Sequence, residues 1–217
     1  MTLSLRASNI SKSYNGNAVL KDCSFSFEQP GIYVLTGPNG CGKSTFLRIC
    51  ALLEQPDKGD VSYHDAQGPV LPDIALKRRL TLVLPRLGLF NKTVFKNAAY
   101  GLTVRGIKGK EADERVRRIL EFAGLGHKEN QNALTLSSGE SQRLGIARAL
   151  IIEPEILFLD EPTASIDEKN TAIIEDIIRW LKRQGRSTIV MTTHDRQQAA
   201  GLADFLMVMN DGKISVS

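Results

Sequence analysis

The sequence has no long hydrophobic run and few cysteines, and these absences exclude several classes of protein. Its longest apolar stretches, such as Ile156 to Leu159, are far shorter than the roughly 20 residues that a helix needs to cross a bilayer. The N-terminal stretch MTLSLRASNI lacks the apolar segment of a secretory signal. Cys23, Cys41 and Cys50 have neither the even number of a disulfide framework nor the spacing of a metal site. We therefore expect a soluble protein of the reducing cytoplasm, which reaches a membrane only through a partner.

The composition also lacks the charge excess of a dedicated nucleic-acid binder. The 217 residues include 28 Lys and Arg against 24 Asp and Glu, which gives a net charge of +4 without dense basic blocks. There is no internal repeat, low-complexity tract or linker rich in Pro, Gly or Ser. With 42% hydrophobic and 24% charged residues the chain is ordinarily globular. Its length favours one large domain, or one domain with a subdomain.

Short β-prone runs alternate with stretches of helical apolar spacing. We predict strands at residues 3–9, 23–28, 32–36, 59–64, 80–84, 156–160 and 188–192. We predict helices over residues 42–53, 94–106, 110–123, 137–152 and 167–184, and a last hairpin around Asn210-Asp211-Gly212. Such alternation favours an α/β fold with a mainly parallel sheet, whose ligands bind beyond the carboxyl ends of the strands. Residues 86–140 form a helical insert in this scheme.

A glycine-rich phosphate-binding motif follows the strand predicted at 32–36. Residues 37–44 match G-x-x-x-x-G-K-[ST] between an apolar strand and a helix, the context that this motif requires. Glycines let the backbone fold closely around phosphates, Lys43 neutralises β/γ-phosphate oxygens, and Ser44 supplies an oxygen to Mg²⁺. The alternative is a chance glycine-rich turn. The predicted nucleotide-binding residues here are Gly37, Pro38, Asn39, Gly40, Cys41, Gly42, Lys43, Ser44 and Thr45.

Two carboxylates end the apolar strand predicted at 156–160. Asp160 at the strand end is positioned to hold Mg²⁺ through water, and Glu161 lies one residue further out, where it can polarise the attacking water as a general base. The alternative is a buried strand with solvated acids at its exit. The preceding phosphate-binding motif favours the catalytic interpretation.

Residues 136–143, Leu-Ser-Ser-Gly-Glu-Ser-Gln-Arg, resemble the LSGGQ signature of the ATP-binding cassette (ABC) ATPases. Ser137 is a good N-cap, and the Ser137-Ser138-Gly139 stretch offers a hydroxyl and backbone donors at a helix N-terminus. Without the other motifs this segment would be an ordinary capped helix. The resemblance implies that Ser137, Ser138, Gly139 and Glu140 meet the γ-phosphate held by an opposite subunit, so that two chains sandwich two ATP molecules.

The resemblance covers essentially the whole chain in the family's order, and it implies three further site residues. Tyr14 matches the aromatic residue that stacks on adenine, although a lone tyrosine near a turn is otherwise a packing residue. Asp167, in Ala-Ser-Ile-Asp, looks like the D-loop aspartate that helps to shape the opposing site. His194, in Thr-His-Asp, matches the switch histidine that reaches the γ-phosphate.

Several positions depart from the family's pattern. Pro85 stands where the Q-loop normally presents a glutamine, and proline has no side-chain oxygen for a metal. Either water replaces the glutamine or Arg86 contacts phosphate instead. Ser138 for Gly and Glu140 for Gln are milder changes. Cys41 is a tolerated variable position or, as an alternative hypothesis, a thiol that makes the enzyme sensitive to thiol reagents.

The resemblance also implies an architecture and partners. The chain is expected to be a single ABC ATPase domain, 1–217, in which residues 1–85 and 141–217 form the catalytic core with an antiparallel β-subdomain and 86–140 form the helical subdomain. As a bare cassette it is expected to homodimerise on ATP and to dock on permease subunits at the cytoplasmic face of the membrane, with an extracytoplasmic substrate-binding protein as a third component and no nucleic acid.

The expected cargo comes from one further likeness. Residues 89–102 are similar to the corresponding region of compact oxyanion importers, most nearly the tungstate/molybdate group. The alternatives are a different ABC importer or exporter, a regulatory or scaffold cassette on a membrane complex, and a soluble cassette acting on DNA or ribosomes. The last usually carries two cassettes or a long coiled coil, which this chain lacks.

Overall fold

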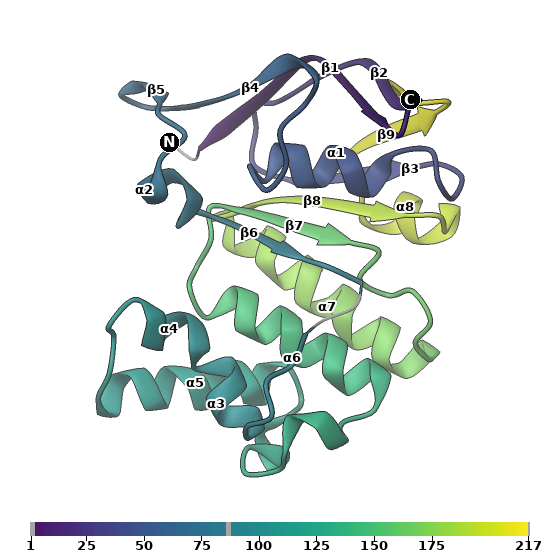
Figure 1. Cartoon of the computed structure of the whole chain (residues 1–217). Coiled ribbons are helices and arrows are strands. Elements are labelled where there is room, and N and C mark those ends of the chain that lie inside the picture. The colour runs from purple at the N-terminus through teal and green to yellow at the C-terminus, as the bar shows by residue number, and fades with distance from the viewer. Residues whose placement is uncertain (1–2, 86–87, 217) are drawn as a thin grey trace. The chain divides into compact units, whose positions relative to one another are not determined.

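The computed structural model describes residues 3–85 and 88–216, which separate into two compact units (Figure 1). The first unit comprises residues 1–82, 155–161 and 181–217, and the second comprises 83–154 and 162–180. Within the described ranges no helix is long and apolar enough to span a membrane.

The first unit contains an antiparallel sheet formed by the N-terminal part of the chain. Its strands are β1 (Ser4–Tyr14), β2 (Asn17–Phe27), β4 (Lys58–Asp65) and β5 (Gly68–Val70), in the order β2-β1-β4-β5. β1 and β2 form a hairpin that turns at Asn15 and Gly16, both with positive φ, as such a tight turn requires. Leu5, Ala7 and Ile10 of β1 are buried, so this sheet covers a core on one face.

The second sheet of the same unit is mainly parallel. Its strands are β3 (Ile32–Thr36), β6 (Leu80–Val83), β7 (Ile156–Asp160), β8 (Thr188–Thr193), β9 (Phe205–Asn210) and β10 (Lys213–Val216), in the order β10-β9-β3-β8-β7-β6. β3 pairs in parallel with β8 and β9, and β7 pairs in parallel with β8. Because parallel strands end at the same edge, the segments that follow β3, β7 and β8 are brought together. This arrangement confirms the predicted α/β fold with an antiparallel β-subdomain.

Helix α1 (Lys43–Cys50) lies between the two sheets of the first unit, as Figure 1 shows. Phe46, Leu47 and Ile49 are fully buried in a core that residues from both sheets complete. The helix is therefore fixed by packing on two sides, which holds its N-terminus at the carboxyl end of β3. Two shorter helices, α2 (Ile74–Lys77) and α8 (Arg196–Leu202), also belong to this unit.

The second unit is helical. It contains α3 (Val94–Ala98), α4 (Tyr100–Val104), α5 (Lys110–Phe122), α6 (Ser138–Leu150), two 3₁₀ turns at Gly126–Lys128 and Ala133–Thr135, and most of α7 (Glu168–Gln184). Val94, Leu120 and Leu144 are fully buried in its own apolar core. Asn97 is buried as well, and its side chain bonds the backbone of Phe90, which fixes the segment before α3.

The observed elements differ from the sequence expectation at a few places. The helix predicted over 94–106 is two short helices, with Ala99 ending one and preceding the next. The first strand continues from Asn9 to Tyr14 through register shifts against its neighbours. α2, α8 and β5 were not predicted, because they are short and carry little apolar periodicity.

Candidate functional site

The loop at residues 37–42 needs its glycines because two of them lie too close to neighbouring atoms to carry a side chain, and because all three have positive φ. Gly37 has φ 153°, and a Cβ there would lie 2.2 Å from the carbonyl oxygen of Met209. Gly42 has φ 111°, and its Cβ would lie 2.7 Å from Leu20. Gly40 has open space around it but a φ of 79°, which L side chains adopt at a cost. Because Gly42 is the N-cap of α1 and has no side chain, the first N–H groups of that helix stay available to an anion.

Lys43 is folded back over this loop. Its side chain is only 4% exposed, and its Nζ donates to the carbonyl oxygens of Gly37 at 2.9 Å and Pro38 at 3.1 Å. The same Nζ lies 3.6 Å from Glu161 Oε1. A buried ammonium group is costly unless it is paired, so these contacts stabilise a positive charge inside the loop.

Asp160, at the end of β7, is joined to two hydroxyl groups. Its side chain is 2% exposed, and its Oδ1 accepts hydrogen bonds from Ser44 Oγ at 2.9 Å and from Thr192 Oγ1 at 2.7 Å. Because Ser44 uses its hydrogen in this bond, its lone pairs are left for a cation. One hydroxyl and one carboxylate fit Mg²⁺, which takes few protein ligands besides water and phosphate oxygens. Among the described residues, no group of three or more His, Cys, Asp or Glu side chains is placed to hold a metal.

Glu161 occupies an unusual backbone conformation next to Asp160. Its φ is 47°, in the left-handed region, and its N–H donates to Thr192 Oγ1 at 2.9 Å. Its carboxylate lies between Lys43 Nζ and His194 Nδ1, with both contacts at 3.6 Å. His194 follows β8, and its side chain is 57% exposed. The Glu161 carboxylate is therefore on the solvent-accessible side of the phosphate-binding loop, where it can accept a proton from water.

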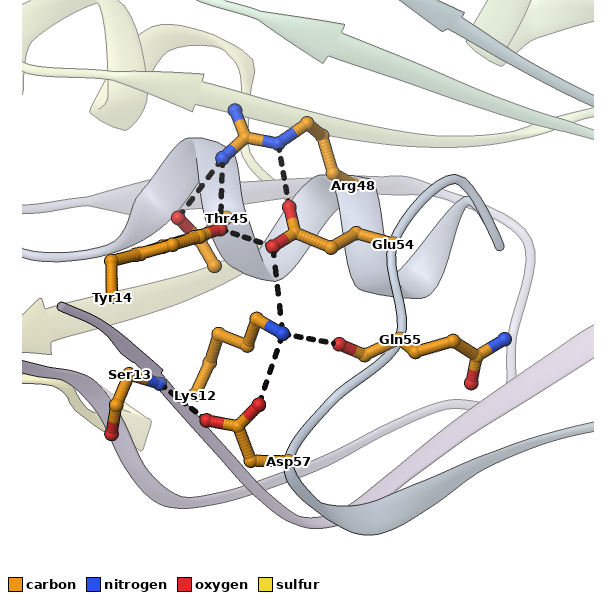
Figure 2. A network of polar contacts seen from close by, with 8 residues as sticks. All are labelled: Lys12, Ser13, Tyr14, Thr45, Arg48, Glu54, Gln55 and Asp57. Atoms are coloured by element: carbon orange, nitrogen blue, oxygen red, sulfur yellow. Dashed lines mark hydrogen bonds and ion pairs between the residues drawn. The ribbon is translucent and has the colours of Figure 1, made fainter. Parts of the chain in front are cut away.

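Tyr14 is anchored through its hydroxyl, as Figure 2 shows. The hydroxyl bonds the Glu54 carboxylate, and Arg48 bridges Glu54 Oε2 at 3.0 Å and Thr45 Oγ1 at 3.1 Å. Lys12 Nζ lies 5.7 Å from the centroid of the ring, which is 38% exposed. Although burial acts in the opposite direction, hydrogen bonds with Tyr14 and Arg48 lower the pKa of Glu54. Tyr14 at the end of β1 is thereby connected to α1, the helix of the phosphate-binding motif.

The signature segment forms a capping box in the second unit. The Ser137 side chain accepts from the N–H of Glu140, and the Glu140 carboxylate accepts from the N–H of Ser137 at 3.0 Å. Lys128 Nζ donates to Glu140 at 2.6 Å. The bond from Lys128 is the main cause of a lowered pKa at Glu140, and partial burial opposes it. Ser137 and Ser138 are exposed, so the N-terminus of α6 remains accessible.

Asp167 and Gly139 meet at one side chain, Asn170. Asp167 accepts from the N–H of Asn170 at 2.8 Å and from its amide at 2.6 Å, and Arg143 Nε donates to the amide oxygen at 2.9 Å. A Cβ on Gly139 would lie 2.3 Å from Asn170, so glycine is required by this close approach. Backbone and side-chain bonds from Asn170 lower the pKa of Asp167.

The structure therefore places the predicted site residues in two groups. Residues 37–45, Asp160, Glu161, His194 and Tyr14 lie in the first unit, and Ser137, Ser138, Gly139, Glu140 and Asp167 lie in the second. Pro85 is exposed. Arg86, the suggested substitute for the missing glutamine, lies outside the described residues. Cys41 is buried, and its sulfur faces Gly37.

Some residues at the site were not identified from the sequence. Thr192, Arg48, Glu54, Lys128 and Asn170 each bond a predicted site residue. Thr192 offered a weak signal, because it is a polar residue that directly follows the apolar run Ile189 to Met191. The others look like ordinary surface side chains until the fold brings them to their partners.

A glycine-rich loop between a parallel strand and a buried helix, with a hydroxyl, a lysine and two acids around it, defines a nucleotide-binding protein of the P-loop α/β class. The family model described as ABC transporter matches residues 20–164. The chain belongs to this family and is one of its ATP-binding domains, which confirms the resemblance seen in the sequence.

Individual relatives agree with this assignment. The chain is 37% identical to a tungstate uptake system ATP-binding protein from Peptoclostridium acidaminophilum, covering 98% of the chain and 97% of the relative. It is 35% identical to a spermidine/putrescine import ATP-binding protein from Mycoplasma mycoides subsp. mycoides, covering 97% of the chain but only 60% of that relative. Among solved structures, a dimeric ATP-binding cassette in a post-hydrolysis state bound to ADP and Pi matches with a TM-score of 0.86 and 26% identity, over 97% of this chain and 96% of that one.

Proposed function

We propose that this chain is the ATP-hydrolysing, nucleotide-binding subunit of a multi-subunit membrane importer. The observation that carries the proposal is the position of the Glu161 carboxylate, between Lys43 and His194 and next to the bonded pair of Ser44 and Asp160. This combination supplies a proton acceptor, a cation and oxygen donors at the end of one phosphate-binding loop.

Each residue then has a task in hydrolysis. The loop N–H groups and Lys43 bind the phosphates, and Ser44 with Asp160 holds Mg²⁺, which when bound neutralises charge on the phosphate oxygens. Glu161 takes a proton from the attacking water. His194, exposed beside Glu161, contacts the γ-phosphate. Tyr14 stacks on adenine, held there by its bond to Glu54.

The signature residues complete the site of a second copy. Ser137, Ser138 and Gly139 present the exposed N-terminus of α6 to the γ-phosphate bound by the partner copy, and Asp167 shapes the same site. Lys128 bonds the Glu140 carboxylate, which reduces the repulsion between that carboxylate and phosphate. Two chains thus enclose two ATP molecules, and loss of the γ-phosphate removes contacts that hold the dimer closed. The dimeric relative with ADP and Pi supports this arrangement.

The helical part of the chain transmits this motion to permease subunits. We assign residues 1–85 and 141–217 to the catalytic core with its β-subdomain and residues 86–140 to the helical subdomain, within one ABC ATPase domain, 1–217. Phe90, Tyr100, Val104 and Ile107 expose apolar surface on this part, which suits attachment to a membrane subunit. Attachment of this kind makes the chain peripheral to the cytoplasmic face of the membrane.

The cargo assignment is an oxyanion such as tungstate or molybdate, delivered by an extracytoplasmic binding protein. It is supported by the tungstate uptake relative, which matches over nearly the full length of both chains. The spermidine/putrescine relative, at similar identity, favours a second candidate, the ATPase of a different importer.

The proposed function is tested with Glu161→Gln, which keeps the shape of the side chain but removes the proton acceptor. We expect this variant to bind ATP, to hydrolyse it at least a hundredfold more slowly than wild type, and to form an ATP-dependent dimer in size exclusion with Mg²⁺. Asp211→Asn, a change at an exposed ion pair with Lys21, is the matched control and should behave as wild type. A Glu161→Gln protein that turns over ATP at the wild-type rate contradicts the proposal.

A further inference from the structure

Thr192 is a buried polar residue to which the proposed mechanism gives no task. It lies in β8 beside Asp160 of β7, in the register of parallel strands, and its exposed fraction is 0%. The residues just before it in β8, Ile189 to Met191, are apolar and buried. A hydroxyl in such surroundings lowers stability unless its donor and acceptor are paired. What Thr192 contributes to the site therefore depends on the groups to which its hydroxyl is hydrogen-bonded.

The Thr192 hydroxyl links the two acidic residues of the site. It donates to Asp160 Oδ1 at 2.7 Å and accepts the N–H of Glu161 at 2.9 Å. One hydroxyl has one hydrogen and two lone pairs, so it makes both bonds at once. Valine has nearly the same shape as threonine but forms neither bond, whereas serine keeps both.

The bond to Asp160 fixes the carboxylate that would face a cation. Oδ1 of Asp160 accepts from Ser44, on the phosphate-binding helix, as well as from Thr192, on the neighbouring strand. Two donors from different elements leave the carboxylate little freedom to rotate.

The bond to Glu161 acts on a strained backbone. A φ of 47° lies in the left-handed region, which is unfavourable for a residue other than glycine, so this conformation needs support from its surroundings. The bond from the Glu161 N–H to Thr192 is such a support. This conformation directs the carboxylate between Lys43 and His194, where the proton acceptor is needed.

We propose that Thr192 is a positioning residue for ATP hydrolysis, whose hydroxyl holds the turn between Asp160 and Glu161 in the orientation that the reaction requires. It acts through these two residues and not by contact with nucleotide or water. The inference rests on the proposed function, because the turn matters for catalysis only if Asp160 and Glu161 carry it out.

The test compares Thr192→Val, Thr192→Ser and Thr192→Ala in the full-length chain. ATP affinity is measured by titration, and hydrolysis of bound Mg-ATP is followed in single turnover with protein in excess, so that slow rates are still resolved. We expect Thr192→Val and Thr192→Ala to bind ATP within about threefold of wild type and to hydrolyse it at least tenfold more slowly. Thr192→Ser should return to within about threefold of the wild-type rate.

Thr188→Val is the matched control, because Thr188 is buried in the same strand at the end far from the two acids. It should leave hydrolysis within twofold of wild type. Wild-type turnover in both Thr192→Val and Thr192→Ala overturns the inference, as does a Thr192→Ser protein as slow as Thr192→Ala. If Thr192→Val does not fold, Thr192→Ser and Thr192→Ala still decide the question. Glu161→Gln is measured alongside to distinguish failure of the Thr192 inference from failure of the proposed function. An active Glu161→Gln protein rejects the proposed function itself.

Discussion

Tyr14 illustrates how a single residue combines an exposed face with a fixed position. Its ring is partly open to solvent, while its hydroxyl bonds Glu54 and is reached by Arg48 (Figure 2). Arg48 in turn bonds Thr45, directly after Ser44 of the phosphate-binding motif. Because its hydroxyl is bonded to these side chains, the Tyr14 ring is already ordered before a base binds, which reduces the entropy lost on binding.

Two substitutions at Tyr14 separate the contribution of the aromatic ring to ATP binding from that of the hydroxyl. Tyr14→Ala should weaken ATP binding about tenfold or more, because stacking of a base on an aromatic ring is worth about 1–3 kcal/mol. Tyr14→Phe keeps the ring and should bind ATP within about threefold of wild type. Isothermal titration with ATP, and with inorganic triphosphate as the base-free control, checks this. Equal losses for ATP and triphosphate in Tyr14→Ala would show that the ring does not contact the base.

The site residues were predictable from sequence to different degrees. The motifs that contain Lys43, Ser44, Asp160 and Glu161 have spacings that carry the chemistry, so the sequence alone identifies these residues. The link through Thr192 was not, because it depends on the register of β8 against β7 and on the unusual φ of Glu161. Neither property follows from the local sequence.

At the scale of elements, caps and short apolar runs explain what was and was not predicted. Strands β3 and β7 were predicted to the residue, since each is a continuous buried run with clear ends. α8, Arg196–Leu202, was missed because it is short and has little apolar periodicity, although Asp195 is an N-cap whose side chain accepts from the N–H groups of Gln197 and Gln198. α6 was predicted through Ser137, and its capping box confirms the N-cap role.

The capping box of α6 should make stability depend on pH. Lys128, despite the opposing effect of burial, lowers the pKa of Glu140, so the ionised form stabilises the folded state above the usual carboxyl pKa. That stabilisation is lost as pH falls through the lowered pKa. Glu140→Gln should therefore reduce the free energy of unfolding by about 1 kcal/mol at pH 7 and by less below about pH 4.

Urea unfolding of Glu140→Gln and wild type at pH 7 and pH 3.5 measures this difference. Glu114→Gln, at an exposed position on α5, is the control and should change stability little at either pH. A difference for Glu140→Gln that stays constant from pH 7 to pH 3.5 would mean that the charge of Glu140 does not contribute.

At the scale of the whole molecule, catalysis and cargo selection belong to different chains in the proposed importer. In the proposed mechanism the site residues act on ATP and water, and none is assigned to cargo. The fold is common to importers of different cargo, as the tungstate and the spermidine/putrescine relatives indicate. Selectivity should therefore reside in the permease and the binding protein.

This separation predicts two different responses to cargo. ATP hydrolysis by the isolated chain should change by less than about twofold with micromolar tungstate, molybdate or spermidine. After reconstitution with its permease and loaded binding protein in vesicles, tungstate or molybdate should stimulate hydrolysis severalfold and spermidine should not. Stimulation by spermidine alone would replace the oxyanion assignment with the polyamine one.

The contact between Gly37 and Met209 has a consequence for the order in which the molecule is built. The phosphate-binding loop belongs to the first quarter of the chain, yet the backbone it packs against belongs to β9, which the ribosome makes close to the end of this sequence. β3 likewise gains its neighbours β8 and β9 only then. Pairings so distant in sequence form slowly, because a long loop must close first. During translation, residues 37–45 are therefore synthesised well before β8 and β9, the strands that β3 and the phosphate-binding loop pack against.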